Sequence, residues 1–327
     1  MKRLGIFILV LLLGGLLVSC NKKKDTINLG LLKVPNDAML AKQMGLFEEN
    51  FNKIGYKVKY YYFDSGVEAN KAIISKDIDF ATMGNTNGLV ALGKNLDTEL
   101  IWIHETLGEV EALAVRNDLN INDVSQLKGK KIATTFASTA HYILLNVLKE
   151  VGIENEVTLL NMKTSEIVAA WSRGDIDGAY TWQPSLGKLL DLNGTVLVSS
   201  RDMIEKGYMT ANIELVRKSF ANENPLVVKA YIESMKDAYD YYINNEEAAI
   251  KHLAKELEIA EDEIRVEVKG SIWTSLSDMQ SEKFITDYVS TMHEQAVFMK
   301  GQGMIERDIS LDEVKVFINN SYALGVS

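Results

Sequence analysis

The chain has 327 residues, a formal net charge of −10 and 47% hydrophobic residues. This apolar fraction is typical of a folded globular protein and excludes an intrinsically disordered one, and the length allows two domains of ordinary size. The acidic balance argues against binding to nucleic acid, which needs a basic surface, and the single cysteine excludes an internal disulfide or a metal site made of several cysteines.

The first twenty residues have the composition of an export signal. Lys2 and Arg3 supply a positive start, and the apolar run at 4–18 is short for a bilayer-spanning helix of about 20 residues. The run ends in LVSC at 17–20, which resembles the lipobox of bacterial lipoproteins. The resemblance implies a signal peptide at 1–19, cleavage before Cys20 with lipid attached to its sulfur, and a lipidated tether at 20–26. The alternative is a buried cysteine that follows an uncleaved membrane anchor.

Strand and helix patterns alternate in the chain that follows. Strands are predicted at 27–32 and 57–63, and helices at 36–47 and 67–75. Asn36 or Asp37 is a plausible N-cap for the first of these helices. Because helices separate the strands, the pattern predicts an α/β fold with mostly parallel sheets.

Two segments 98 residues apart end in the same way. A glutamate, Glu68 in one segment and Glu166 in the other, stands nine residues before an Asp-Ile-Asp sequence that closes a helix and opens a strand. The offset is far too long for a solenoid repeat. It favours two similar α/β lobes, with chance similarity of a short motif as the alternative.

From Pro225 onward the pattern is mainly helical and rich in charge. Helices are predicted at 226–242, 246–257, 264–272 and 282–300. We expect these helices to pack on the outside of a lobe, away from any functional site.

The motifs of common enzymes and metal sites do not occur. His104 and Glu105 are followed by Thr-Leu-Gly and not by the pattern of a zinc protease, and neither a nucleophile elbow nor a phosphate-binding glycine loop is found. No pair of the four histidines has the spacing of metal ligands. We therefore expect no catalytic residue, cofactor or metal, although a catalytic site built from residues distant in the sequence stays possible.

Several motifs resemble those of the substrate-binding proteins of taurine ABC importers, within a wider group that binds aliphatic sulfonates, nitrate and thiamin precursors. The motifs are FDSG at 63–66, DFATMGNT at 79–86, EALAV at 111–115, LKGKKIA at 127–133, FASTAHY at 136–142 and AAWSRGDIDGAYTWQP at 169–184. The last two are those of the taurine branch. The resemblance implies a two-lobe periplasmic-binding-protein fold (type II) with the ligand cleft between the lobes. Lobe 1 would comprise 27–115 plus 212–327, and lobe 2 would comprise 116–211.

Taurine carries a sulfonate at one end and an ammonium group at the other. Removal of the predicted signal peptide takes away Lys2 and Arg3, so the net charge of the remaining chain is −12. The sulfonate must therefore be held by local dipoles, which helix N-termini supply through their unpaired N–H groups. Two predicted helices, one in each lobe, begin with suitable polar residues. These residues are Asn85, Thr86, Ser138, Thr139 and His141. The alternative is that such residues only cap their helices.

The ammonium group needs an acceptor, and the resemblance places Glu111 opposite the amine. Trp182 would wall the pocket and offer a cation–π contact, whereas Trp171 is expected in the core. The family pattern has an aspartate where this chain has Asn212, so the amine loses one charged acceptor. Asn36 and Asp37 lie in a loop that also lines the cleft in the family, and Asp37 is a candidate to replace the missing charge.

Together these features predict a lipid-anchored, monomeric binding protein on the extracytoplasmic side of the cell membrane. It would deliver taurine or a related small aliphatic sulfonate to an ABC permease and its ATPase, and it would not bind nucleic acid. The alternative is a binding protein for a thiamin pyrimidine precursor or nitrate on the same fold.

Overall fold

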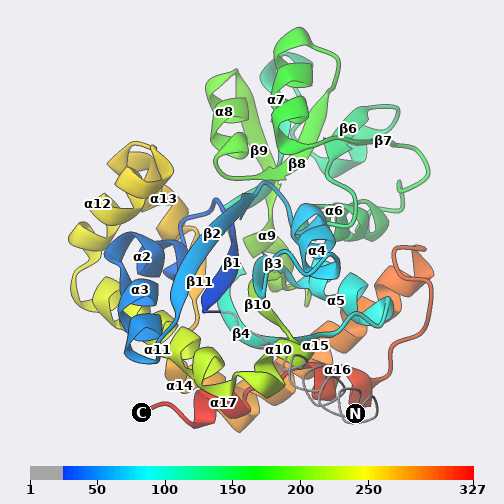
Figure 1. Cartoon of the computed structure of the whole chain (residues 1–327). Coiled ribbons are helices and arrows are strands. Elements are labelled where there is room, and N and C mark those ends of the chain that lie inside the picture. The colour runs from blue at the N-terminus through cyan, green and yellow to red at the C-terminus, as the bar shows by residue number, and fades with distance from the viewer. Residues whose placement is uncertain (1–24) are drawn as a thin grey trace, which may run out of the picture.

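The computed structural model describes residues 25–327, which fold into two α/β lobes (Figure 1). The predicted signal peptide, Cys20 and most of the tether lie outside the described residues. Within the described part of the chain, no helix combines the length and the apolar character needed to cross a bilayer.

The larger lobe is built on a six-stranded sheet in the order β11-β4-β10-β3-β1-β2. Strands β1 and β2 are parallel, as are β1 and β3, whereas β10 runs antiparallel to β3 and β4. The sheet is therefore mixed, which corrects the prediction of mostly parallel strands. The strands are β1 (Thr26–Leu32), β2 (Lys57–Phe63), β3 (Phe80–Gly84), β4 (Thr98–Leu107), β10 (Ala211–Arg217) and β11 (Ser271–Trp273).

The smaller lobe contains a five-stranded sheet in the order β7-β6-β8-β5-β9. Its strands β6, β7 and β8 are parallel, and β5 is antiparallel to β8 and β9. The order and directions match those of β2-β1-β3-β10-β4 in the larger lobe. The strands are β5 (Glu111–Arg116), β6 (Lys131–Thr134), β7 (Thr158–Asn161), β8 (Gly178–Trp182) and β9 (Gly194–Ser199).

The repeated Asp-Ile-Asp segments occupy the same place in the two sheets. Asp79 accepts a hydrogen bond from the backbone N–H of Asn28 at 2.9 Å, and Asp177 accepts one from the backbone N–H of Lys131 at 2.8 Å. Each aspartate follows a helix and precedes a strand, α4 (Gly66–Ile74) with β3 in one lobe and α7 (Thr164–Arg173) with β8 in the other. The prediction of two similar lobes from this repeat is confirmed.

Helices cover the faces of both sheets. The predicted helix at 36–47 is divided at Gly45, whose φ of 75° ends one helix and starts the next. In the larger lobe the early helices are α2 (Asp37–Met44), α3 (Leu46–Lys53), α4 and α5 (Asn85–Gly93). In the smaller lobe they are α6 (Thr139–Glu150), α7, α8 (Ser185–Asp191) and α9 (Ser200–Ile204), with short 3-10 turns at Asn117–Leu119 and Val124–Leu127.

The C-terminal third returns to the larger lobe as a series of helices. The predicted helix at 264–272 ends earlier, at Lys269, and Ser271–Trp273 instead forms edge strand β11 against β4. The helices are α10 (Lys218–Glu223), α11 (Pro225–Asn244), α12 (Glu246–Leu257), α13 (Glu261–Lys269), α14 (Leu276–Gln280), α15 (Glu282–Gly301), α16 (Leu311–Phe317) and α17 (Ser321–Leu324).

Aromatic rings anchor this C-terminal part to the first sheet. Tyr231 of α11 stacks on Phe80 of β3 with ring centroids 4.9 Å apart, and it also packs against Phe47 at 5.3 Å.

In the smaller lobe Trp171 is buried and donates from Nε1 to the carbonyl of Leu192 at 3.0 Å, so its predicted core position is confirmed.

The chain passes between the lobes twice. It leaves the larger sheet after Leu107 and enters the smaller one at Glu111, and it returns between Ile204 and Ala211. Strand β5, most of which the sequence analysis assigned to lobe 1, thus pairs entirely within the smaller sheet. We propose lobe borders at these two passages.

Candidate ligand-binding site

One end of the six-stranded sheet faces the smaller lobe and carries a row of polar residues. The strand registers place Trp273 of β11 opposite Glu105 of β4, Glu105 opposite Asn212 of β10, and Asn212 opposite Gly84 of β3. Residues opposite one another in neighbouring strands lie on the same face. The row therefore brings together side chains from four strands that are far apart in the sequence.

Next to this row lies a small cavity of about 30 Å³ between the lobes. A much wider cleft of about 1070 Å³ adjoins it, and Val34, Gln183 and Glu267 line both spaces. The remaining residues around the small cavity come from both lobes. They are Pro35, Glu105, Leu107, Val110, Trp182, Asn212 and Ser271.

Glu105 is the most informative residue of the row, and the sequence analysis missed it. Its side chain is buried, Oε1 accepts a hydrogen bond from Asn212 Nδ2 at 2.6 Å, and the side chain of Asn36 is a second hydrogen-bond partner of the carboxyl. Burial raises the pKa of Glu105 to about 7. The sequence offered no distinct signal for Glu105, because His104 and Thr106 beside it are polar and the same strand also contains Glu99.

Glu267 of α13 faces the same cavity from the C-terminal helices. It is only 3% exposed, and its Oε2 has no hydrogen-bond partner within residues 25–327. Burial, with a smaller effect from nearby Glu263, raises its pKa to about 7. The expectation that these helices lie away from any site is therefore wrong for α13.

Glu111 is fully buried at the start of β5, in register with Trp182 of β8. Its Oε1 accepts hydrogen bonds from Ser200 at 2.8 Å and Thr210 at 3.4 Å, and its Oε2 accepts one from Thr139. Burial raises its pKa to about 7, although the three hydroxyls favour the ionised form. Both oxygens thus have partners, and Glu111 is not among the residues that line the small cavity.

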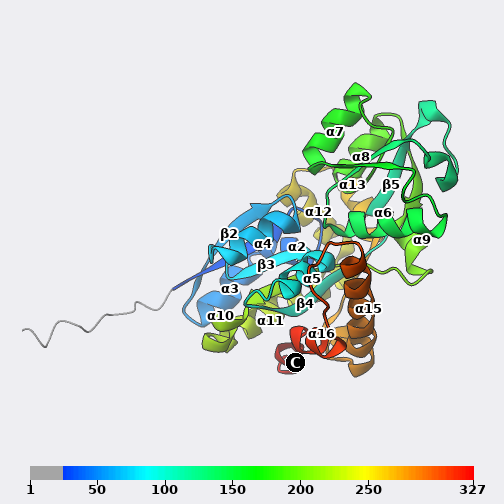
Figure 2. The same cartoon turned by 90° about the vertical axis from the view of Figure 1, so that its right-hand side faces the viewer.

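The N-termini of α5 and α6 meet across the lobe boundary (Figure 2). Gly84, the N-cap of α5, lies so close to Thr139 that an added Cβ would stand 2.8 Å from the Thr139 methyl carbon. Thr86 and Asn87 donate to the carbonyl of Ala137 at 3.3 Å and 3.0 Å. The structure therefore brings together the two helix starts that the sequence analysis selected.

Ser138, Asn85 and His141 have partners within the protein. Ser138 caps α6 by accepting from the backbone N–H of His141 at 3.2 Å, and Asn85 Nδ2 donates to Gln295 Oε1 at 2.8 Å. His141 Nδ1 accepts from the backbone N–H of Ala137, and burial lowers its pKa to about 4. The histidine is therefore neutral near pH 7 and offers no positive charge to an anion.

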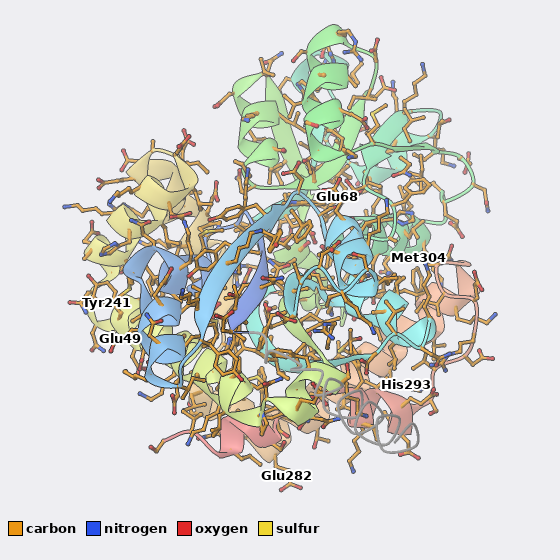
Figure 3. The ribbon with its side chains drawn as sticks, viewed as in Figure 1. Glu49, Glu68, Tyr241, Glu282, His293 and Met304 are labelled. Atoms are coloured by element: carbon orange, nitrogen blue, oxygen red, sulfur yellow. The ribbon has the colours of Figure 1, made fainter. Side chains whose placement is uncertain are left out.

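A second contact between the lobes lies at the surface near this junction. Glu68 of α4, labelled in Figure 3, accepts a hydrogen bond from Lys163 Nζ at 2.7 Å, and this contact lowers the pKa of the carboxyl. Lys163 precedes α7 of the other lobe. An exposed pair of this kind stabilises by less than about 1 kcal/mol, so it links the lobes without locking them.

Asn36 and Asp37 lie at the start of α2. Asn36 caps the helix by accepting from Met39 N at 3.1 Å, and its side chain also hydrogen-bonds to Glu105 and lowers the pKa of that carboxyl. Asp37 is fully buried, accepts from Trp102 Nε1 at 2.7 Å and pairs with His104 Nδ1. Asp37 is not among the residues lining the cavity or the cleft, so it does not supply a free charge there.

His104 joins two carboxylates beneath the row. Its Nδ1 contacts Asp37, and its Nε2 lies 3.0 Å from Glu214 Oε2, which also accepts from Thr82 Oγ1 at 2.8 Å. Burial opposes the charged imidazolium, but the two carboxylates outweigh it and raise the pKa of His104 to about 10. This network fixes β4 and the start of α2 behind the site. Across residues 25–327, no group of three or more His, Cys, Asp or Glu side chains is arranged to hold a metal ion.

Comparisons with known proteins agree on one family. The family model of the substrate-binding domain of the ABC-type glycine betaine transport system matches residues 25–256. The taurine-binding periplasmic protein of Escherichia coli (strain K12) is 36% identical over 259 residues, which cover 77% of this chain and 79% of that protein. A putative aliphatic sulfonates-binding protein of Bacillus subtilis (strain 168) is 26% identical over 222 residues, covering 67% and 65% of the two chains.

Solved structures share the fold at lower identity. The alkanesulfonate-binding protein SsuA from Xanthomonas axonopodis pv. citri, bound to MOPS, has a TM-score of 0.76 at 20% identity and covers 89% of this chain and 97% of its own. The desulfurization enzyme DszB has a TM-score of 0.64 at 14% identity, with 92% and 98% covered. The same architecture thus occurs in a sulfonate-binding protein and in an enzyme.

Proposed function

Because the chain belongs to the family of ABC-type substrate-binding domains, we propose that it captures taurine or a related small aliphatic sulfonate and delivers it to an ABC permease and its ATPase. The observation that carries this proposal is the 36% identity to a taurine-binding periplasmic protein over 79% of that protein's length. The predicted family and the two-lobe periplasmic-binding-protein fold are confirmed. Taurine is favoured over the alternatives of nitrate or a thiamin pyrimidine precursor.

The sulfonate end is proposed to bind between the N-termini of α5 and α6. The unpaired backbone N–H groups of the first turns attract an anion. The hydroxyls of Thr86 and Thr139, which donate to Ala137 and Glu111 in the structure, would turn to the sulfonate when it binds. These helix starts belong to different lobes and already lie against each other. Opening of the lobes would expose them, and closure on a sulfonate would place one on each side of it.

Glu111 is proposed to accept a hydrogen bond from the ammonium group of the ligand, although its oxygens already have hydroxyl partners. An ammonium group would reach one of its oxygens only if the hydroxyl of Thr139 or Ser200 turned away. If Glu111 contacts the amine, Glu111→Ala will weaken taurine binding more than ethanesulfonate binding. Equal losses would mean that it only positions the hydroxyls around it.

Family membership implies an extracytoplasmic location, and we propose that Cys20 anchors the protein there through lipid. Two or more acyl chains give stable membrane anchoring, whereas a single chain is marginal. Cys20→Ser is expected to release the protein from the membrane fraction, which immunoblotting of fractionated cells would show. Retention of the variant in the membrane would contradict the proposed anchor.

We propose that the protein is a monomer and does not transform its ligand. The relatives at 26–36% identity carry the names of binding proteins, whereas the enzyme DszB shares only the fold. Incubation of the protein with taurine, followed by mass spectrometry, should return the ligand unchanged.

A calorimetric panel tests the proposed function directly. Taurine, ethanesulfonate, sulfate, nitrate and a thiamin pyrimidine precursor would be titrated into the purified protein. We expect binding of taurine, and binding of ethanesulfonate if the sulfonate supplies most of the affinity. The absence of binding by any sulfonate would refute the proposal, and tight binding of the pyrimidine alone would favour the alternative.

A further inference from the structure

A third pocket lies beside the junction of the lobes and is separate from the wide cleft. It has a volume of about 340 Å³ and is lined by α4, α5, Ala137 and the segment 303–306 that follows α15. Met304 of this segment is labelled in Figure 3. The pocket shares no lining residue with the small cavity or the wide cleft. Its volume falls in the range of about 300–1,000 Å³ that is usual for sites of small organic molecules.

The wall formed by 303–306 is fixed to the C-terminal end of α5. Arg307 donates from Nε to the carbonyl of Gly93 at 3.1 Å and from Nη2 to the carbonyl of Leu92 at 3.0 Å. It thereby satisfies two of the carbonyl groups that are left unpaired at the end of a helix. Ile305 is buried, and a Cβ added to Gly93 would stand 2.5 Å from its Cγ2 methyl carbon. The pocket is therefore a preformed part of the fold.

Two lysines line the pocket without ion-pair partners. Lys71 belongs to α4 and Lys94 caps the C-terminus of α5, and no ion pair is found for either within residues 25–327. Glu68, on which Lys71 acts at longer range, is already bound by Lys163. Glu306 is the one acid among the described residues that line the pocket. The lining is thus positive by one charge, in a protein whose net charge is −10.

Apolar side chains form most of the remaining lining. Ile74, one turn beyond Lys71 on α4, is 54% exposed, so apolar surface lies next to the cation. Covering such a surface with an apolar group is favourable. The pocket therefore suits a ligand that has both an apolar body and an anionic end. The apolar residues are Val67, Ile74, Val90, Leu96, Met304 and Ile305.

Both lobes contribute to the pocket. Ala137 of the smaller lobe lines it together with Asn87 of α5, and Asn87 Nδ2 donates to the carbonyl of Ala137 at 3.0 Å. Ala137 has a φ of 64°, a conformation that is unfavourable for a residue with a Cβ, and its carbonyl is held by contacts from the other lobe. Opening of the lobes would move Ala137 away from α4 and α5. A ligand that contacts all three would thus favour the closed arrangement.

We propose that this pocket is a second binding site, which takes a small organic anion with an apolar body, such as a medium-chain carboxylate, and favours closure of the lobes when it is occupied. Lys71 and Lys94 would hold the carboxylate, and the apolar chain would pack against α4, α5 and 303–306. Because coupling between two sites is reciprocal, a ligand in the cleft would also tighten binding in the pocket. The second site does not depend on which ligand the cleft holds.

Isothermal titration calorimetry with octanoate tests the site. Acetate, which lacks the apolar body, and octylammonium, which has the opposite charge, are the comparison ligands. We expect octanoate to bind the wild type more tightly than either. The double variant Lys71→Gln, Lys94→Gln should bind octanoate about 4- to 25-fold more weakly, which corresponds to about two- to fivefold for each solvent-exposed ion pair. The control Lys76→Gln changes an exposed lysine just after α4 that does not line the pocket, and it should match the wild type.

Three results would overturn the site itself. They are no binding of octanoate, binding of octylammonium as tight as that of octanoate, and equal octanoate affinities of the double variant and the wild type.

The link to closure is tested by titrating taurine with and without saturating octanoate. We expect octanoate to tighten taurine binding by about 5- to 150-fold, the usual range of coupling between two sites, and the double variant to lose this effect. An unchanged or weaker taurine affinity would overturn the link. If taurine does not bind the wild type, the proposed function fails separately. Small-angle X-ray scattering then tests the link alone: octanoate should lower the radius of gyration of the protein, and an unchanged radius would overturn it.

Discussion

Replacing Glu267 with glutamine should stabilise the unliganded protein, and the gain should grow with pH. Burial raises the pKa of Glu267 from its ordinary 4.5 to about 7, so the folded chain holds the proton more tightly than the unfolded chain. Its contribution to stability is therefore present at low pH and is lost as pH rises toward 7. Since one pKa unit corresponds to about 1.4 kcal/mol, ionised Glu267 destabilises the fold by about 3 kcal/mol.

Glutamine keeps the shape of the protonated carboxyl and cannot ionise. The difference in free energy of unfolding between Glu267→Gln and the wild type should therefore rise from less than about 1 kcal/mol at pH 5 to about 3 kcal/mol at pH 8. Urea unfolding followed by circular dichroism at several pH values measures this difference. Glu261→Gln removes an exposed carboxylate from the same helix and should stay within about 0.5 kcal/mol of the wild type at every pH.

Two results would refute this reasoning. A difference that does not depend on pH would mean that Glu267 has an ordinary pKa in the folded protein. A variant less stable than the wild type at pH 8 would mean that the carboxylate has a stabilising partner. The expected result, a variant whose stability gain over the wild type grows with pH, would show that burial of the ionised carboxylate costs stability.

The remaining predictions concern the framework behind the site. His104→Ala leaves the buried carboxylates of Asp37 and Glu214 without their shared cation, and we expect a loss of about 3–5 kcal/mol in urea unfolding; a loss below 1 kcal/mol would contradict the paired network. Asp79→Ala removes the acceptor of the Asn28 backbone N–H at 2.9 Å and the partner of the Arg217 guanidinium at 2.6 Å. Asp177→Ala removes only the acceptor of the Lys131 backbone N–H at 2.8 Å. Asp79→Ala should therefore cost about 2–3 kcal/mol and Asp177→Ala about 1 kcal/mol, and the reverse order would refute this ranking.

Local patterns in the sequence were enough to predict the repeated framework. Strands 27–32 and 57–63 were placed within a residue of β1 and β2, because alternation and flanking turn residues act over a few positions. The repeated Asp-Ile-Asp segment also identified equivalent strands in the two sheets, β3 and β8. The direction of β10 was not predictable in this way, because it depends on a chain that returns from the other lobe.

The site was predicted less completely, for a physical reason. The helix N-termini near Thr86 and Thr139 were predicted because the residue types preferred there can be recognised in the local sequence. Glu105 and Glu267 become neighbours of one cavity only after the segment of α13 and β11 returns to the larger sheet and β11 pairs with β4, and no short-range pattern records this. Asp37 illustrates the opposite error: the sequence shows a free carboxylate at a loop, whereas folding pairs it with His104.

The site lies where equivalent strand ends of the two repeated sheets face each other, and the residues at these ends differ in chemistry. Glu111 of β5 and Asn212 of β10 occupy matching positions, opposite the last residues of β8 and β3. In the smaller lobe the carboxylate of Glu111 is bound by Ser200, just beyond β9, whereas in the larger lobe the amide of Asn212 binds the carboxylate of Glu105 on β4. Each of the two strand ends thus holds a buried acid through neutral side chains, three hydroxyls for Glu111 and the amides of Asn212 and Asn36 for Glu105. Glu267, from a helix outside the repeat, adds a second buried acid on the side of the larger lobe.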